Sequence, residues 1–116
     1  MKIGFIGIGQ MGGPMARQIL EAGYDLSVYD LRKERTQHLL GKGAKWIDNP
    51  KAVAESCQVV LSCLPGPSDM EAVVYGLNGL MEGWKKGDIY VDMSTNLPVS
   101  IRRVAEDALH LCLAAM

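Results

Sequence analysis

Apolar residues are grouped along this chain in short runs, and the segments between the runs follow a different periodicity. Four runs have the length and composition of strands: 3–6, 26–29, 59–64 and 89–93. The segments between them carry apolar residues at helical spacing or residues typical of turns. This alternation indicates βαβ units and predicts an α/β fold with a parallel sheet. Residues 59–64 are apolar at both alternating positions, which is typical of a strand covered by helices on both faces.

The segment after the first strand has the clearest helical pattern. Met11, Met15 and Ile19 lie at helical spacing, and Gly23 is a stop signal. Pro14 falls within the first turn, where backbone N–H groups have no acceptor inside the helix, so it is compatible with a helix start. We therefore expect a helix between the first two strands that ends near Gly23.

Two later helices are expected on similar grounds. Ser68 and Glu71 fit a capping box for a helix over 69–75, and Gly76 is expected to end that helix with a positive φ. The other helix is expected to begin within 96–98 and to bury one apolar stripe. The stripe comprises Ile101, Val104, Ala105 and Ala108, and the charged residues left for solvent are Arg102, Arg103, Glu106 and Asp107.

The remaining segments are less strongly patterned. Residues 44–47 fit a weak strand, and a short helix is expected from Pro50. Residues 109–116 fit either a helix end or a sixth strand, and the sequence does not choose between them.

Composition and charge fit one globular domain. Of 116 residues, 48% are hydrophobic and 22% are charged, which allows a modest core. With 12 basic and 13 acidic residues the chain has no overall positive field, so nucleic acid is not an expected partner. Its apolar runs are shorter than the roughly 20 residues that span a bilayer as a helix, so no membrane partner is expected.

The start of the chain and its cysteines bear on location. The chain opens with a strand-like segment, where a secretory signal would carry a basic stretch and a longer apolar run, so we expect a cytoplasmic or similarly reducing location. Cys57, Cys63 and Cys112 match no zinc spacing and are expected to be small buried apolar residues. His38 and His110 lack acidic or sulfur neighbours at ligand spacing, so no metal site is expected.

A glycine-rich motif of the form G-x-G-x-x-G follows the first strand and opens the first expected helix. It comprises Gly7, Ile8, Gly9, Gln10, Met11 and Gly12. Gly7 permits a tight turn, Gly9 removes a side chain where a pyrophosphate must approach the backbone, and Gly12 allows close packing of helix and strand. Free amides and the positive end of the helix dipole then face the phosphates. The motif and its context predict a doubly wound parallel sheet of the Rossmann type that binds a dinucleotide.

Asp30 follows the second strand, 18 residues after Gly12, where an acidic side chain binds adenosine ribose hydroxyls. Its carboxylate accepts hydrogen bonds from a 2′-hydroxyl but repels a 2′-phosphate, so NAD is the expected cofactor in preference to NADP. Arg32, Lys33 and Arg35 follow closely and could neutralise a phosphate, which leaves NADP open as the alternative.

Three separated motifs are more specific than a generic Rossmann loop. They are G-F-I-G-I-G-Q-M-G-G-P-M-A at 4–16, C-L-P-G-P at 63–67 continued by E-A-V at 71–73, and D-M-S-T-N-L-P at 92–98 followed by Ser100. On these motifs the chain resembles the 3-hydroxyisobutyrate dehydrogenase group of β-hydroxyacid dehydrogenases, which are related to phosphogluconate dehydrogenase. The resemblance covers residues 1–108 in both order and spacing.

The resemblance implies roles for residues outside the glycine motif. Leu64 and Pro65 would line the nucleotide cleft, with Asp69 nearby. Thr95 would lie against the nicotinamide, and Ser94 and Thr95 would meet the carboxylate or hydroxyl of a small hydroxyacid substrate. Hydroxyls at the carboxyl end of a strand can fill this role, although both could instead cap the next helix. The implied activity is hydride transfer between NAD and a small β-hydroxyacid.

The family pattern stops near residue 108. Members of the family continue to an all-helical domain that supplies a catalytic lysine, and no lysine of this chain matches that motif, so no catalytic residue is assigned. We expect residues 1–108 to be an NAD(P)-binding Rossmann domain and 109–116 to be an atypical, truncated end. The exposed apolar surface left by a missing partner domain would favour a homo-oligomer.

Two other interpretations remain. A non-catalytic module that only holds a dinucleotide explains the missing lysine equally well. A methyltransferase that binds S-adenosylmethionine through a glycine loop is weaker, because it leaves the motifs at 63–67 and 92–98 without a role.

Overall fold

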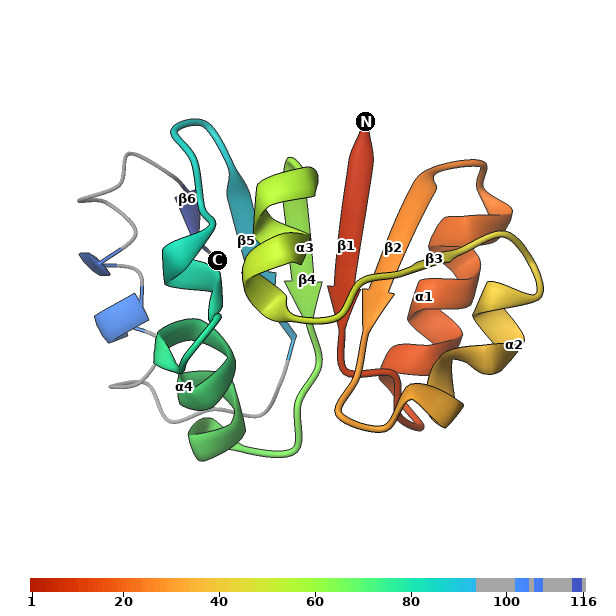
Figure 1. Ribbon diagram of the computed structural model, residues 1–116, viewed down its shortest axis with the longest axis horizontal. Coiled ribbons are helices and arrows are strands. Elements are labelled where there is room, and N and C mark those ends of the chain that lie inside the picture. The colour runs from red at the N-terminus through yellow and green to blue at the C-terminus, as the bar shows by residue number, and fades with distance from the viewer. Residues whose placement is uncertain (94–101, 105, 108–113, 116) are drawn as a thin grey trace.

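A parallel sheet of six strands forms the centre of the computed structural model (Figure 1). The structure describes residues 1–93, 102–104, 106–107 and 114–115. In their order across the sheet the strands are β3 (Lys45–Trp46), β2 (Asp25–Tyr29), β1 (Lys2–Ile6), β4 (Val59–Ser62), β5 (Ile89–Asp92) and β6 (Ala114–Ala115). The order 3-2-1-4-5-6 is that of a doubly wound Rossmann sheet, so the predicted α/β fold is confirmed.

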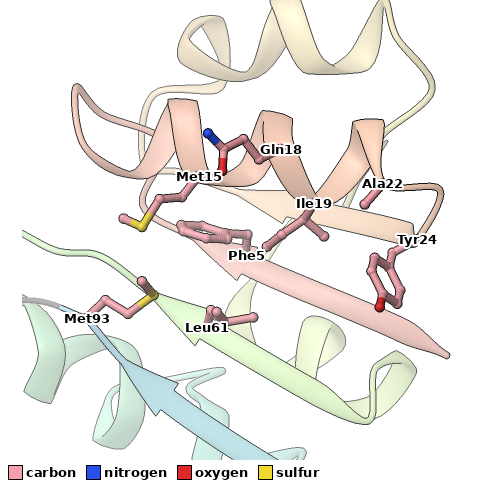
Figure 2. A pocket seen from close by; sticks show the side chains of 8 residues that line it. All are labelled: Phe5, Met15, Gln18, Ile19, Ala22, Tyr24, Leu61 and Met93. Atoms are coloured by element: carbon pink, nitrogen blue, oxygen red, sulfur yellow. The ribbon is translucent and has the colours of Figure 1, made fainter.

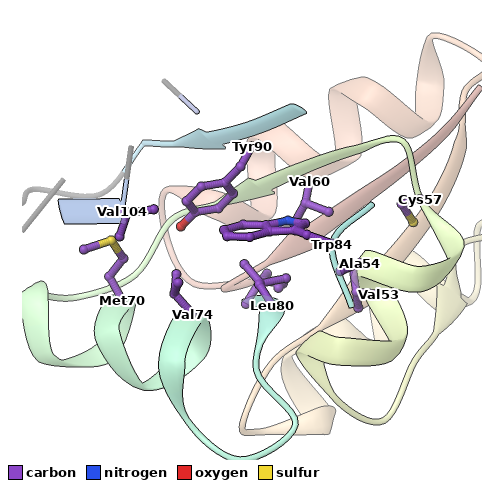
Figure 3. Close-up of a cluster of buried hydrophobic side chains, with 11 residues drawn as sticks. Val53, Ala54, Cys57, Val60, Met70, Val74, Leu80, Trp84, Tyr90 and Val104 are labelled. Carbon is purple, nitrogen blue, oxygen red and sulfur yellow. The ribbon is translucent and has the colours of Figure 1, made fainter. Parts of the chain in front are cut away.

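Alternate residues of a strand point to opposite sides, so both faces of the sheet carry apolar side chains. Helices cover both faces. They are α1 (Gly12–Glu21), α2 (Gln37–Leu40), α3 (Pro50–Ser56) and α4 (Pro67–Tyr75), with 3₁₀ helices η1 (Lys33–Thr36) and η2 (Leu80–Glu82). On one face α1 and α2 contribute Ala16 and Leu39 to a buried cluster. On the other face α3 and α4 contribute Val53 and Val74 to a second cluster, together with Tyr90 of β5 (Figure 3).

The sequence signals for α1 and α3 are confirmed. Pro14 is the third residue of α1, and Gly23 has a φ of 94° directly after the last turn. α3 begins at Pro50, as expected, and the side chain of Asn49 caps it by accepting a hydrogen bond from the Ala52 N–H at 2.8 Å.

α4 ends at Tyr75 as predicted, but its predicted start and the positive φ expected at Gly76 are wrong. α4 begins at Pro67, because proline suits the first helical position, so Ser68 lies inside the helix and forms no capping box with Glu71. Gly76 has a φ of −69° rather than a positive one. A glycine is needed at position 76 for a different reason, because a Cβ there would lie 2.4 Å from the carbonyl oxygen of Ala72.

The later segments are partly described. The weak strand expected at 44–47 is present as β3, and residues 114–115 form a sixth strand paired with β5. Residues 102–104 and 106–107 are helical, with Val104 buried. The other stripe residues, Ile101, Ala105 and Ala108, lie outside the described residues.

The carboxyl ends of the parallel strands meet at one edge of the sheet. The connections from β1 to α1, from β2 to η1 and from β4 to α4 gather there, at the lower edge in Figure 1. β1 and β4 are neighbours in the sheet, yet the helices that follow them lie on opposite faces. This arrangement is the topological switch point, the place where open α/β sheets bind their ligands.

Candidate functional site

A cleft of about 1060 Å³ opens at the switch point. Its volume lies at the upper end of the range of ligand pockets, about 300 to 1000 Å³. The sequence-predicted residues that line it are Gly7, Ile8, Gly9, Gln10, Met11, Gly12, Asp30, Leu64, Pro65 and Asp69. The structure thus brings the glycine motif, Asp30 and the segment that carries Leu64, Pro65 and Asp69 together around one cleft. Ser94 and Thr95 lie outside the described residues.

Gly7 and Gly12 are glycines that the fold itself requires. Gly7 has a φ of 95°, and a Cβ there would lie 2.2 Å from the carbonyl oxygen of Cys63. A Cβ on Gly12 would lie 1.9 Å from the carbonyl oxygen of Gly7 and 3.2 Å from the ring of Phe5. Both contacts involve backbone atoms that cannot move aside. A larger residue at Gly12 would therefore separate α1 from the end of β1, and one at Gly7 would push the glycine loop away from the segment after β4.

Gly9 is different, because the fold has no need of a glycine there. Its φ lies outside the positive region, and the atom nearest to a Cβ at this position is Arg35 Nη1, 4.0 Å away. The absent side chain leaves open space at the wall of the cleft. In a Rossmann loop, the pyrophosphate must come close to the backbone at this position.

The start of α1 supplies donors beside that open space. Amides of the first helical turn have no acceptor within the helix. No side chain caps α1, and no acidic residue occurs in its first turn. The first turn of α1 therefore carries no negative side chain of its own, which suits an anionic ligand at this helix start.

Asp30 lies at the carboxyl end of β2 and is buried, with 8% of its surface exposed. Its Oδ2 accepts a hydrogen bond from the Ile8 N–H at 2.7 Å, and its Oδ1 accepts one from the Arg32 N–H at 2.8 Å. Each carboxylate oxygen has two lone pairs, so the same group can accept further hydrogen bonds from ribose hydroxyls.

Several cleft residues were not assigned from the sequence. Among them are Leu31 and Leu77, whereas Arg32 and Arg35, considered above as groups that could neutralise a phosphate, line the same cleft. Both leucines are almost fully solvent-exposed, at 87% and 91%. The sequence carries a signal for them, since each is an apolar residue placed two positions after the last residue of a strand or helix, where polar residues are usual.

The floor of the cleft is formed by the end of β4. Cys63 lines it, and burial, with the nearby charge of Asp92, raises the pKa of the Cys63 thiol, which therefore stays protonated at neutral pH. Behind it, Ser62 Oγ lies 2.6 Å from the Tyr90 hydroxyl and donates to Asp92 Oδ1 at 2.9 Å. Burial raises the pKa of the Tyr90 hydroxyl, so this group also remains neutral. These bonds fix the ends of β4 and β5 against each other.

A second hollow lies on the α1 face of the sheet (Figure 2). It has a volume of about 330 Å³, and its lining is largely apolar, including Phe5, Met15, Ile19 and Leu61. It contains none of the residues that the sequence analysis assigned to a cofactor or substrate. We refer to it below as the apolar groove.

The described residues contain neither a cluster of metal ligands nor a membrane-spanning helix. No group of three or more His, Cys, Asp or Glu side chains in this part of the chain could hold a metal ion. No helix within the described ranges has the length and apolar character needed to cross a membrane.

Comparison with known proteins identifies relatives that are similar over most of this chain. An uncharacterised oxidoreductase of Bacillus subtilis (strain 168), YkwC, is 40% identical over 114 residues, which cover 98% of this chain and 40% of that protein. The 3-hydroxyisobutyrate dehydrogenase of Pseudomonas aeruginosa is 37% identical over 106 residues, covering 91% of this chain and 36% of that protein. The chain therefore spans about two fifths or less of the length of these relatives.

Solved structures and a family model agree with these relatives. The structure of Psf3 in complex with NADP+ and 2-OPP superposes with a TM-score of 0.92 at 25% identity, covering 97% of this chain and 40% of that one. Residues 2–114 match the model of the NAD-binding domain of 6-phosphogluconate dehydrogenase. The match spans nearly the whole chain, and it includes the glycine loop and the strands that border the cleft. The chain belongs to this family of NAD-binding domains.

Proposed function

We propose that this chain is the coenzyme-binding domain of an oxidoreductase that transfers hydride between NAD and a small β-hydroxyacid. The observation that carries the proposal is the open position at Gly9, beside the uncapped start of α1. This position leaves space beside the uncapped start of a helix, as expected for a pyrophosphate site. The names of the relatives, an oxidoreductase and a 3-hydroxyisobutyrate dehydrogenase, support the reaction class.

Each cleft residue has a role in this proposal. The backbone of 7–12 binds the pyrophosphate, Asp30 accepts the ribose hydroxyls, and Leu64, Pro65 and Asp69 line the cleft. The nicotinamide, when bound, is the group that accepts or supplies the hydride. Ser94 and Thr95, which follow β5 in the sequence, are proposed to meet the nicotinamide and the substrate.

The proposal divides the reaction between two parts of a longer polypeptide. Residues 1–108 supply the coenzyme site, and the lysine that acts as general acid or base comes from polypeptide outside these 116 residues. We also propose that the protein is cytoplasmic. The chain is further proposed to self-associate through exposed apolar surface.

NAD is the proposed coenzyme, with NADP as a weaker ligand. The carboxylate of Asp30 repels a 2′-phosphate at the ribose. Arg32 and Arg35 border the same part of the cleft and would offset this repulsion in part.

A fluorescence titration tests the proposal. Trp46 lies 5.6 Å from the ring of Tyr29, which lines the cleft, so its emission should report coenzyme binding. Trp84 is buried in the core at 7% exposure, and a Trp84→Phe variant removes its background. We expect saturable quenching by NADH, weaker quenching by NADPH and no response to S-adenosylmethionine. Quenching by S-adenosylmethionine alone, or by none of the three, would contradict the proposal.

A further inference from the structure

Asp30 connects the two loops that border the cleft. One carboxylate oxygen accepts the N–H of Ile8, in the glycine loop after β1, at 2.7 Å. The other accepts the N–H of Arg32, in the turn before η1, at 2.8 Å. The two bonds link the loop proposed to hold the pyrophosphate to the segment that carries Arg32 and Arg35.

The bond to the Ile8 N–H is buried and the bond to the Arg32 N–H is partly buried, so water does not easily replace the first of them. Asp30 is 8% exposed and Ile8 is 2% exposed. Hydrogen bonds from N–H groups to a carboxylate are charge-assisted and stronger than those between neutral groups. The neighbouring amide, that of Gly7, donates to the Tyr29 carbonyl at 3.0 Å, so two successive amides of the loop are fixed to the end of β2.

We propose that Asp30 is a positioning residue for the whole coenzyme site: it holds the glycine loop and the arginine-bearing turn in their binding geometry, whatever group the ribose carries. The inference rests on the proposed function, because it assumes that the loop binds a dinucleotide. It also assigns Asp30 a role that ribose recognition does not include.

The two roles predict opposite results for NADPH. If Asp30 acted only as a negative charge beside the ribose, its removal would relieve the repulsion of the 2′-phosphate and strengthen NADPH binding. If Asp30 holds the loops, its removal weakens the binding of both NADPH and NADH. NADH then loses more, because its ribose hydroxyl loses an acceptor as well.

The experiment compares four forms of the chain: wild type, Asp30→Ala, Asp30→Asn and Asp25→Asn. Asn keeps the shape of Asp but has one acceptor oxygen, so it can satisfy only one of the two amides. Asp25 is the matched control, since it lies at the other end of β2 and its carboxylate forms an exposed ion pair with Lys45 at 3.6 Å. Circular dichroism checks that each variant is folded. If Asp30→Ala is not folded, the test uses Asp30→Asn.

Titration with NADH and NADPH gives the first readout. We expect Asp30→Ala to weaken NADPH binding by about tenfold, the loss of one charge-assisted hydrogen bond, and NADH binding by more. Asp30→Asn should weaken both coenzymes, and Asp25→Asn should leave both unchanged. NADPH binding that is tighter or unchanged in Asp30→Ala and Asp30→Asn would overturn the inference.

Amide exchange in the coenzyme-free chain gives a second, independent readout. By NMR, the Ile8 and Arg32 amide protons should exchange faster with solvent in both Asp30 variants, by about tenfold or more, and at the wild-type rate in Asp25→Asn. Unchanged exchange at Ile8 and Arg32 would overturn the positioning role even if coenzyme binding fell. If the wild type bound neither coenzyme while these amides responded, the proposed function would fail, and Asp30 would be shown only to fix the two loops to each other.

Discussion

The cleft at the carboxyl edge of the sheet and the apolar groove on the α1 face are both open to solvent, but they differ in what the fold does with their lining. The groove is lined by side chains such as Phe5, Ile19 and Leu61 that also belong to, or pack against, the core beneath α1. The cleft is lined by a glycine loop, a buried carboxylate, two arginines and two exposed leucines.

The difference shows how a binding site can be separated from a packing defect. Apolar lining in the groove is explained by the core that it covers. The open position at Gly9, the uncapped start of α1 and the exposure of Leu31 and Leu77 have no explanation in packing. Features that the fold maintains but does not use are the ones that point to a ligand.

Replacing Gly12 with alanine should have the largest effect, because it damages both the fold and the cleft. The new Cβ would meet the Gly7 carbonyl oxygen at 1.9 Å. Overpacking of this kind should lower the free energy of unfolding by about 3 kcal/mol, measured by urea denaturation, and NADH binding should be lost with it. Gly41→Ala is the control: its φ is −64° and the nearest atom is 3.6 Å away, so stability should stay the same or rise by up to about 1 kcal/mol. Equal stability of the two variants would contradict the packing role of Gly12.

Replacing Gly9 with valine should separate binding from folding. The side chain would enter open space, so the free energy of unfolding should change by less than about 0.5 kcal/mol. It would also block the approach of the pyrophosphate, and the loss of two charge-assisted hydrogen bonds should weaken NADH binding by about 100-fold. A variant that binds NADH as the wild type does would show that the ligand lies elsewhere.

The exposed leucines should have a smaller effect that is also confined to binding. Leu31→Ser and Leu77→Ser remove apolar surface that protein atoms hardly cover, so stability should change by less than about 0.5 kcal/mol. If this surface contacts the coenzyme, each variant should weaken NADH by about fivefold in calorimetric titration. An affinity equal to that of the wild type in both variants would show that these leucines serve something else.

A substitution in the apolar groove should have the smallest effect on binding. Tyr24 lines the groove at the amino end of β2 and is 47% exposed. The glycine loop lies one strand length away, about 17 Å for five residues. Tyr24→Ser should therefore leave NADH affinity within about twofold of the wild type, as expected for distant independent sites. A larger loss would mean that the two hollows are coupled or that the groove takes part in binding.

Sequence periodicity predicts most of this fold because the signals are local. The strands, the glycine loop and the helices that begin at Gly12 and Pro50 follow from spacing, turn residues and caps within a few residues of one another. The error at Ser68 arose where two local signals compete, since Pro67 moves the helix start by two residues. The sequence left open whether 109–116 ends a helix or forms a strand, because the pairing of residues 114–115 with β5 is a contact between distant parts of the chain.

The candidate site was predictable to the same extent. Residues of the glycine loop, with Leu64, Pro65 and Asp69, could be assigned from motifs and resemblance, and they line one cleft. The bonds from Asp30 to Ile8 and Arg32 could not be predicted, because they depend on how two separate loops approach. The difference between Gly9 and Gly12 is also invisible in the sequence, where both are motif glycines, and appears only when neighbouring atoms are placed.

An NMR titration of the ¹⁵N-labelled wild-type chain with NADH tests the central claim most directly. The amides of residues 7–12 and of Asp30 to Arg32 should shift and saturate together, while those of Gln18 and Tyr24 in the apolar groove stay in place. Saturable shifts in the groove with no change at 7–12, or no shifts at any coenzyme concentration, would contradict a dinucleotide site at the start of α1.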